Sequence, residues 1–276
     1  MAESPAIAPG QTILVGLRFE LADKWHIYWH GRNDTGFAPT VEWTLPEGVT
    51  IGPMLWPAPE RYISPGAILD HVYEGEPTIL MPVTLAEGAA SPGDTLTIRG
   101  HADWLVCKQI CLPADQKIDL SLRVESAPPS TAIDASTPIG GALAGLPTPV
   151  GPQGVEGLSI RHQRDATSIR ADGASRVTFY PLEDSTSLLN AIGDASAERD
   201  WLQLRLLPPG EDLGRGDRRL VGVVEIERRV GGQTNTERYL VDHGEDGYRQ
   251  PPNAKELRDA IARLHTPDRT AASRGS

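Results

Sequence analysis

The sequence predicts an all-β fold, with two immunoglobulin-like β-sandwich domains in tandem and a short C-terminal helix. Short segments of alternating apolar and polar residues recur along the 276 residues and are separated by turns rich in Pro and Gly. This pattern is typical of antiparallel sandwiches. A stretch rich in Pro, Gly and Ala divides the segments into two groups of similar size. We therefore expect one domain at residues 1–126 and a second at residues 157–265.

The first domain is expected to consist of half-buried strands. Residues 11–21 alternate between apolar and polar side chains, as a strand does when only one of its faces lies in a core. Turn-forming clusters such as Pro46-Glu47-Gly48 and residues 91–94 interrupt the pattern. The same alternation predicts further strands at residues 40–45, 78–85, 95–101 and 117–124.

Residues 127–156 are expected to form a linker between the two domains. They are rich in Pro, Gly and Ala and carry almost no charge. Such a composition is typical of a connecting segment that packs no core of its own.

Six segments after the linker show strand alternation and predict the second sandwich: residues 158–162, 167–171, 176–180, 201–206, 219–228 and 236–241. One helix is expected at residues 184–192. Another is expected at residues 253–264, because Asn253 can cap it and Glu256 occupies the capping-box position. Its residues Leu257, Ile261 and Leu264 share one face. The polar residues 266–276 are expected to be disordered.

Composition excludes several functions. The net charge of −11 argues against nucleic acid as a partner, because phosphate binding requires a basic surface. No run of 18 or more apolar residues occurs, so no membrane-spanning helix is expected. The first residues lack the basic and apolar regions of a signal peptide, which is expected of a mature or recombinant start. Motifs for nucleotides, catalytic serines and zinc hydrolysis are absent, and we expect no cofactor.

The chain contains two cysteines, Cys107 and Cys111, which are four residues apart. A disulfide that closes a loop of roughly five residues adds only about 2 kcal/mol, against about 4.7 kcal/mol for a loop of roughly 100. The pair therefore indicates redox chemistry before it indicates a structural bond. Three intervening residues fit a turn between neighbouring antiparallel strands. Pro113 cannot donate to a strand ladder, which predicts an edge position that is open to a partner.

Five segments around the pair resemble, in order, the N-terminal periplasmic domain of the DsbD/ScsB family of membrane thiol–disulfide reductases. Phe179–Pro181 and Leu220–Gly222 in the second half resemble the ScsB-like branch, which is associated with copper tolerance. The five segments are Trp25–His30 with Asp34–Gly36, Trp43–Pro46, Trp56–Pro59, His71–Gly75 and Val106–Pro113. The three residues between the cysteines are fewer than in the best-known DsbD proteins.

The resemblance implies a function as a protein-disulfide reductase component in the periplasm, as the soluble part of an inner-membrane protein. Electrons would arrive from the membrane by way of a thioredoxin-like domain of the same full-length protein. They would leave to periplasmic partners that are thioredoxin-like or disulfide isomerase-like. Cys111 would form the mixed disulfides, and Cys107 would resolve them. The residues around the pair do not by themselves indicate which of the two cysteines forms the mixed disulfide.

The family also has a loop that covers the sulfurs with an aromatic side chain. The matching residues here are 62–73, with Tyr62, Leu69, His71 and Tyr73 as candidate covers. The alternative is that Tyr73 belongs to the core and Tyr62 is an ordinary loop aromatic. Tyr28 is a further candidate, because a hydroxyl near the pair could donate a hydrogen bond to a thiolate.

Two other functions compete with thiol exchange. The cysteines could bind copper with soft or imidazole ligands, drawn from His26, His71, His101 and Met54. The spacing of these residues matches no standard zinc site. Alternatively, the disulfide could be structural in a periplasmic binding module without catalytic activity.

Overall fold

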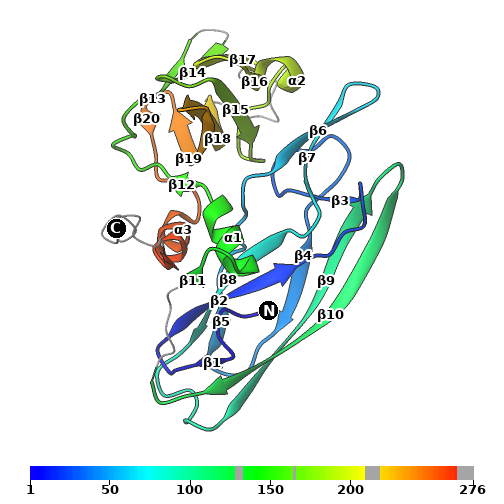
Figure 1. Ribbon diagram of the computed structural model, residues 1–276, viewed down its shortest axis with the longest axis vertical. Helices are drawn as coiled ribbons and strands as arrows, with labels where there is room; N and C mark the ends of the chain where they lie inside the picture. Colours follow the sequence, from blue (N-terminus) through cyan, green and yellow to red (C-terminus); the bar gives the residue numbers. More distant parts are fainter. Residues whose placement is uncertain (128–132, 164–165, 209–217, 266–276) are drawn as a thin grey trace, which may run out of the picture.

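The computed structural model describes residues 1–127, 133–163, 166–208 and 218–265 (Figure 1). It is composed mostly of strands, with three short helices in the described residues. Two β-sandwiches follow each other along the chain, and two helices lie between them. The predicted all-β fold with tandem immunoglobulin-like domains is confirmed. The exact boundaries at residues 126 and 157 stay a prediction. None of the helices in these ranges is long and apolar enough to span a bilayer.

The first sandwich packs a seven-stranded sheet against a three-stranded sheet. The larger sheet has the order β1-β10-β9-β3-β7-β6, with β4 also paired to β9, and the smaller has the order β2-β8-β5. All five strands expected from alternation are present. The strands are β1 (Ala6–Ile7), β2 (Thr12–Arg18), β3 (His26–Tyr28), β4 (Thr40–Thr44), β5 (Val49–Ile51), β6 (Glu60–Ser64), β7 (Ile68–Glu74), β8 (Thr78–Leu85), β9 (Thr95–Cys107) and β10 (Cys111–Val124).

The second sandwich also combines a large and a small sheet. Its six-stranded sheet has the order β12-β19-β18-β15-β16, with β20 paired to β19, and its small sheet has the order β13-β14-β17. All six predicted segments form strands. The strands are β12 (Thr148–Pro149), β13 (Leu158–His162), β14 (Ala166–Ala171), β15 (Arg176–Pro181), β16 (Ser196–Ala197), β17 (Trp201–Arg205), β18 (Arg219–Val230), β19 (Gln233–Gly244) and β20 (Gly247–Tyr248).

The described residues of the segment between the sandwiches, from 133 onwards, include regular structure, and the expectation that the segment packs no core is wrong. It contains β11 (Ile133–Asp134), which pairs with β21 (Leu264–His265), and helix α1 (Pro138–Gly145). Thr137 caps α1 by accepting a hydrogen bond from the N–H of Gly140. A Cβ at Gly140 would lie 1.9 Å from the carbonyl oxygen of Asp134. The Pro and Gly residues therefore start a helix and allow close packing, where composition alone indicates a spacer.

One hydrophobic core joins the two sandwiches. It contains Leu14 and Leu80 from the first sandwich, Tyr180 and Val221 from the second, and Leu143 from α1. Helix α3 (Ala254–Ile261) adds Leu257 and Ile261 to this core, and Leu264, predicted on the same helix face, packs against the core from β21 after the helix has ended. The second sandwich is therefore packed onto the first through shared apolar side chains.

Two details of the predicted helices are wrong. Residues 184–190 form turns and an isolated bridge, and only the last two residues of the predicted range belong to a helix, the four-residue α2 (Ala191–Asp194). The backbone N–H groups of Thr186 and Leu189 donate to Arg219 and Arg205 on neighbouring strands, so they are not available to a helix. Asn253 has a left-handed φ of 54° and makes no side-chain cap with α3. The predicted disorder of residues 266–276 lies outside the described residues.

Candidate redox site

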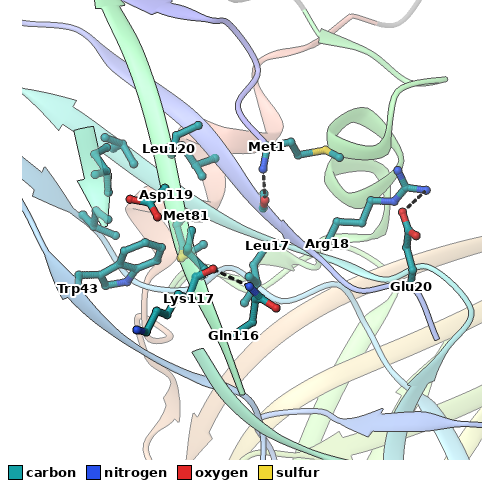
Figure 2. A pocket seen from close by; sticks show the side chains of 16 residues that line it. Met1, Leu17, Arg18, Glu20, Trp43, Met81, Gln116, Lys117, Asp119 and Leu120 are labelled. Atoms are coloured by element: carbon teal, nitrogen blue, oxygen red, sulfur yellow. Dashed lines mark hydrogen bonds and ion pairs between the residues drawn. The ribbon is translucent and has the colours of Figure 1, made fainter. Parts of the chain in front are cut away.

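An open groove of about 570 Å³ runs between the two sheets of the first sandwich (Figure 2). Its walls include Leu17, Trp43 and Met81. The N-terminal amine of Met1 donates to the carbonyl oxygen of Gly16 at its edge, at 2.9 Å. The lining residues include no cysteine and no histidine. The groove therefore offers no thiol or imidazole for exchange chemistry.

The two cysteines lie opposite each other at the tip of the β9–β10 hairpin. Cys107 pairs with Cys111 in the antiparallel register, their Cα atoms are 4.1 Å apart, and their sulfurs form a disulfide. This is the strand–turn–strand arrangement expected from the spacing. On its outer side, within the described strands, β10 pairs only with β1, at Arg123 and Val124. Pro113 therefore lies on an open edge, as its missing N–H indicates.

The two sulfur-bearing residues differ in accessibility. Cys107 is 3% exposed and packs with Tyr28 and Val72, together with the partly buried Tyr62 and Leu105. Cys111 is exposed. Thiol exchange requires that the attacking thiolate reach one sulfur of the disulfide. In this arrangement a protein thiol can approach Cys111, while Cys107 is shielded.

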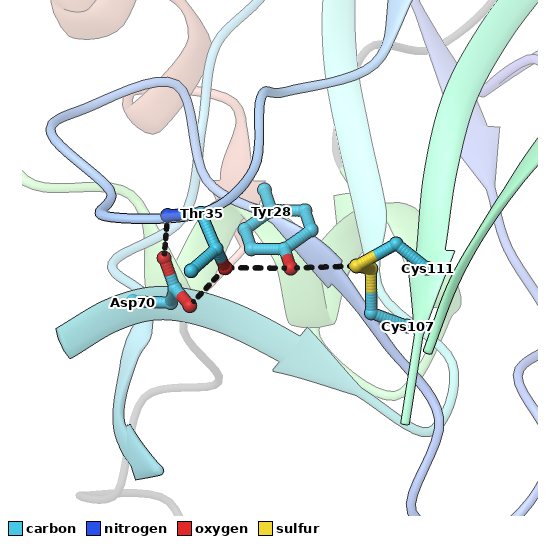
Figure 3. The surroundings of a disulfide bond; sticks show 5 residues. All are labelled: Tyr28, Thr35, Asp70, Cys107 and Cys111. Carbon is cyan, nitrogen blue, oxygen red and sulfur yellow. Dashed lines mark hydrogen bonds between the residues drawn. A yellow bond between two sulfur atoms is a disulfide. The ribbon is translucent and has the colours of Figure 1, made fainter. Parts of the chain in front are cut away.

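Hydrogen bonds connect Sγ of Cys111 to a carboxylate on β7 (Figure 3). The Tyr28 hydroxyl lies 3.4 Å from Sγ of Cys111 and 3.2 Å from Oγ1 of Thr35. Thr35 donates its hydroxyl to Oδ2 of Asp70 at 2.6 Å and its N–H to Oδ1 at 3.0 Å. Because Thr35 gives its one hydroxyl proton to the carboxylate, Tyr28 can donate either to Thr35 or to the sulfur. A Cys111 thiolate would be the stronger acceptor, since it is an anion.

Tyr28 is held in place by its neighbours and stays protonated. The residue is 1% exposed. A Cβ at Gly36 would lie 2.1 Å from its ring, so glycine is required for the loop to pack against it. Burial raises the pKa of Tyr28 above its ordinary value of 10. The hydroxyl is therefore a hydrogen-bond donor throughout the neutral range.

His26 is a site residue that sequence reasoning considered only as a metal ligand. It pairs with Cys107 across β3 and β9, so that both side chains lie on the same face of the sheet. Its ring lies 4.7 Å from that of Tyr62 and 5.5 Å from that of Tyr28, measured between centroids. The residue is 2% exposed, and its Nδ1 has no hydrogen-bond partner. Burial lowers the pKa of His26. Because residues two apart on a strand share a face, the naming of Tyr28 as a site residue could have indicated that His26 also faces the disulfide.

The structure separates the candidate covers into two groups. Tyr62 lies on the disulfide side, over His26. Leu69, His71 and Tyr73 alternate with Asp70 and Val72 along β7, and therefore point to the opposite face.

These three side chains are buried there, which corrects the expectation that they could cover the sulfurs. Tyr73 donates to the carbonyl oxygen of Pro57 and belongs to the core that the sandwiches share. His71 donates from Nδ1 to the carbonyl oxygen of Arg32 at 2.6 Å.

Exposed apolar side chains surround the hairpin tip. Ile110 is 66% exposed in the turn, and Leu112 follows Cys111. Phe37 follows Gly36, which packs on Tyr28. We call these three residues the apolar rim. Ile63 is also exposed, but it pairs with Leu69 and therefore faces away from the disulfide. Exposed apolar groups that cluster around a reactive centre are typical of a protein-docking surface.

Apart from His26, which lies beside Cys107, the candidate copper ligands do not gather around the sulfurs. Met54 packs against the shared core, and His71 lies buried on the far face of β7. His101 contacts the carboxylates of Asp103 and Asp115. Across the described ranges, no group of three His, Cys, Asp or Glu side chains is arranged to hold a metal ion.

The fold and the site together define a thiol–disulfide exchange module, in which an immunoglobulin-like scaffold presents one accessible disulfide at a hairpin tip. Residues 1–122 match the family model described as "Thiol:disulfide interchange protein DsbD, N-terminal". These residues form a DsbD/ScsB-like N-terminal domain, and the resemblance seen in the sequence is confirmed.

The crystal structure of the N-terminal periplasmic domain of ScsB from Proteus mirabilis shares the fold. It covers 85% of this chain and 90% of its own length, with a TM-score of 0.50 and 15% identity. The periplasmic chaperone SfaE and the E. coli chaperone DraB each cover 87% of this chain and 98% of their own, at 9% identity, with TM-scores of 0.24 and 0.22. A search of curated sequences found no match.

Proposed function

We propose that the protein passes reducing equivalents between thioredoxin-like proteins in the periplasm through a reversible Cys107–Cys111 disulfide. One observation supports this proposal above the others. The sulfur of an exposed residue, Cys111, lies beside a hydrogen-bond donor, while Cys107 is buried behind it. Such a pair has one sulfur that partners can attack and one that resolves the mixed disulfide internally.

Each half-reaction transfers two electrons. A donor thiolate attacks Sγ of Cys111, and Cys107 leaves as a thiolate that takes up a proton. The second donor thiolate then attacks the donor sulfur of the mixed disulfide and releases Cys111. In the next half-reaction, the Cys111 thiolate attacks the acceptor disulfide. Cys107 then attacks Cys111, which re-forms the internal bond and releases the reduced acceptor.

Two side chains assist this chemistry in the proposal. The Tyr28 hydroxyl donates to the Cys111 thiolate and thereby lowers the pKa of that thiol. The neutral imidazole of His26 lies beside Cys107, where it can accept the thiol proton when Cys107 attacks. Both side chains belong to β3, so their placement beside the cysteines would be the same whichever partner binds.

The apolar rim fits partners with an apolar surface around their own cysteines. On the donor side we propose a thioredoxin-like domain of the same full-length membrane protein. On the acceptor side we propose periplasmic proteins that are thioredoxin-like or disulfide isomerase-like. The rim excludes water from the exchanging sulfurs and needs no charge complementarity, which suits a module with several partners.

Trapping tests the proposal. The Cys107→Ala variant keeps the accessible sulfur and lacks the resolving one, so it should accumulate a mixed disulfide with an oxidised thioredoxin-like protein. Intact mass and non-reducing electrophoresis detect the product. Cys111→Ala is the matched control and should trap nothing, because its remaining thiol is shielded. If neither variant traps a partner, the exchange function is excluded.

A structural disulfide is the competing function, and the burial of Cys107 is the observation that favours it. The reduction potential distinguishes the two. A pair that exchanges with thioredoxin-like proteins should equilibrate within roughly −180 to −270 mV, whereas a structural bond has a potential below about −300 mV. Titration of the disulfide against a glutathione or dithiothreitol buffer gives this value.

A further inference from the structure

The β6–β7 hairpin, residues 60–74, lies between the disulfide and the second sandwich. Its strands are antiparallel and in register, so that each face of the hairpin carries paired residues. Tyr62 and Asp70 pair with each other on the face that contacts the redox site. Arg61 and His71 pair with each other on the opposite face. We call this element the cap hairpin. Contacts made by the face with Arg61 and His71 therefore determine where Tyr62 and Asp70 lie at the redox site.

Arg61 joins the cap hairpin to the second sandwich. Its Nη2 donates to the carbonyl oxygens of Ala191 and Ile192 on α2, both at 2.9 Å. The side chain is half-buried, and burial lowers the pKa of the guanidinium. A partly buried cation that donates to two carbonyl groups forms stronger hydrogen bonds than a fully exposed one. This contact therefore fixes β6 against α2.

The loop that follows β3 is fixed to the same part of the second sandwich. The backbone N–H of Arg32 donates to the carbonyl oxygen of Pro181 at 2.9 Å. Its guanidinium donates to Oγ of Ser187 at 2.7 Å and to the carbonyl oxygen of Ser185 at 2.6 Å. A Cβ at Gly31 would lie 2.5 Å from the carbonyl oxygen of Pro181, so that only glycine allows the approach. This loop carries Thr35, which links Tyr28 to Asp70.

Apolar contacts complete the junction. The ring of His71 lies 5.5 Å from that of Tyr180, and the ring of Trp29 lies 6.3 Å from the same tyrosine. His71 also donates to the carbonyl oxygen of Arg32, so the cap hairpin and the loop are bonded to each other as well. Residues 180–192 of the second sandwich thus contact both elements that shape the disulfide's surroundings.

We propose that residues 180–192 of the second sandwich brace the redox site, with Arg61 and Arg32 as positioning residues. The brace holds Tyr62 over His26 and Cys107, and it holds Thr35 between Tyr28 and Asp70. The second sandwich thus acts on the exchange reaction through the cap hairpin. The kinetic part of this proposal rests on the proposed function, and the structural part does not.

Hydrogen exchange in the full-length oxidised protein tests the brace. Arg61→Ala should speed amide exchange in residues 60–74 by at least about fivefold, as expected from the loss of hydrogen bonds to a charged group. Strands β13 and β14, remote from the contact in sequence, should keep their protection. Arg176→Ala is the matched control, because it removes an exposed arginine of the second sandwich that pairs with Glu198. It should leave residues 60–74 unchanged.

Arg32→Ala gives an independent test and should speed exchange in residues 29–36 as well. If Arg61→Ala does not fold, Arg61→Lys replaces it, since one ammonium group can still reach a carbonyl and a smaller increase is expected. Unchanged exchange in residues 60–74 of the folded Arg61 variant, or an equal increase in β13 and β14, would overturn the proposal.

Reduction of the disulfide by dithiothreitol gives a readout that a merely structural role would not change. A loosened cap hairpin should speed this reduction at least about threefold in Arg61→Ala and leave it unchanged in Arg176→Ala. Equal rates in the two variants would contradict the brace. Neither measurement uses a protein partner. Failure of the trapping experiment would therefore exclude the exchange function without affecting the test of the brace.

Discussion

Each sandwich contains one long two-stranded hairpin, and the two hairpins end differently. The β9–β10 hairpin ends in residues 108–110, none of which has a positive φ, with a cysteine on either side. The β18–β19 hairpin ends in Gly231-Gly232, with φ of 59° and 82°, between Val230 and Gln233. Residues 229–235 at the second tip are exposed, whereas the first tip lies against β3 and the cap hairpin on one side.

Contacts with β3 and the cap hairpin, here called the lateral support, distinguish the first tip from the second. The long paired strands are common to both hairpins, so they are not what distinguishes the redox site. Neighbouring strands bury Cys107 and leave Cys111 exposed, which gives two chemically identical residues different accessibility. At the β18–β19 tip, no other strand in the described part of the chain pairs with Val230 or Gln233, so nothing there distinguishes the two positions.

The largest expected effect concerns the two thiols of the reduced protein. If exposure of Cys107 requires a local opening that costs about 2–3 kcal/mol, iodoacetamide should modify Cys107 about 30- to 150-fold more slowly than Cys111. Mass spectrometry of the alkylated peptides measures both rates. The variant V230C/Q233C places a pair at the other tip, where the two thiols should react at similar rates. Similar alkylation rates for Cys107 and Cys111 would contradict the inference that the two hairpin tips differ in how they shield their residues.

Acid should weaken the lateral support of the first hairpin. Burial lowers the pKa of His71 to about 4, whereas the unfolded chain titrates near 6.5. The unfolded state therefore takes up a proton first as the pH falls, and the stability contributed by the neutral imidazole decreases from about pH 6.5 downwards. At pH 5 the loss should be about 2 kcal/mol.

Urea unfolding at pH 7.5 and pH 5 measures this loss. His71→Gln should show a smaller difference between the two pH values, because the amide can still donate to Arg32 and does not titrate. An equal pH dependence in both proteins would show that other groups dominate the acid response.

Loss of the Tyr28 hydroxyl should alter the thiol chemistry without changing the fold. In Tyr28→Phe the Cys111 thiolate loses a donor worth about 1.5 kcal/mol, so the pKa of the thiol should rise by about one unit. Absorbance of the thiolate at 240 nm, recorded against pH in the Cys107→Ala background, gives this value. Tyr62→Phe is the control, since the ring of Tyr62 contacts His26. Equal pKa values in the two variants would contradict a role for the Tyr28 hydroxyl.

The smallest effect is expected at the β18–β19 turn. Nothing lies within 4 Å of a Cβ at Gly231, so Gly231→Ala adds only the cost of a left-handed backbone, about 1 kcal/mol. The melting temperature should fall by about 2–4 °C. The rate of disulfide reduction should equal that of the unaltered protein. A change in that rate would show that the two hairpins are coupled.

Much of the fold could be predicted because alternation along a strand is a local property. Thr78–Leu85 and Leu158–His162 form strands with the predicted bounds. The strands without alternation escaped prediction. β3 is three residues long and fully buried, and β7 is buried over most of its length, so neither shows a polar face. Both strands form the floor of the redox site.

The remaining errors concern distant contacts. Residues 138–145 have a composition typical of a linker, but the apolar surfaces of both sandwiches stabilise them as a helix. The cysteines, Tyr28 and Tyr62 could be named from the sequence. That Tyr73 points away from the sulfurs, and that His26 points toward Cys107, depends on strand register, which the turns and partner strands determine together.

The open edge of β10 also affects how copies of the protein behave toward one another. A long unpaired edge can pair with its counterpart on another molecule and initiate aggregation. Here Pro113 lacks a donor, and the exposed Asp115, Lys117 and Asp119 place charges along the same strand. Two such edges brought together would desolvate these charges. The strand that presents the disulfide to a partner is thus protected from self-association, and the protein should stay monodisperse at high concentration.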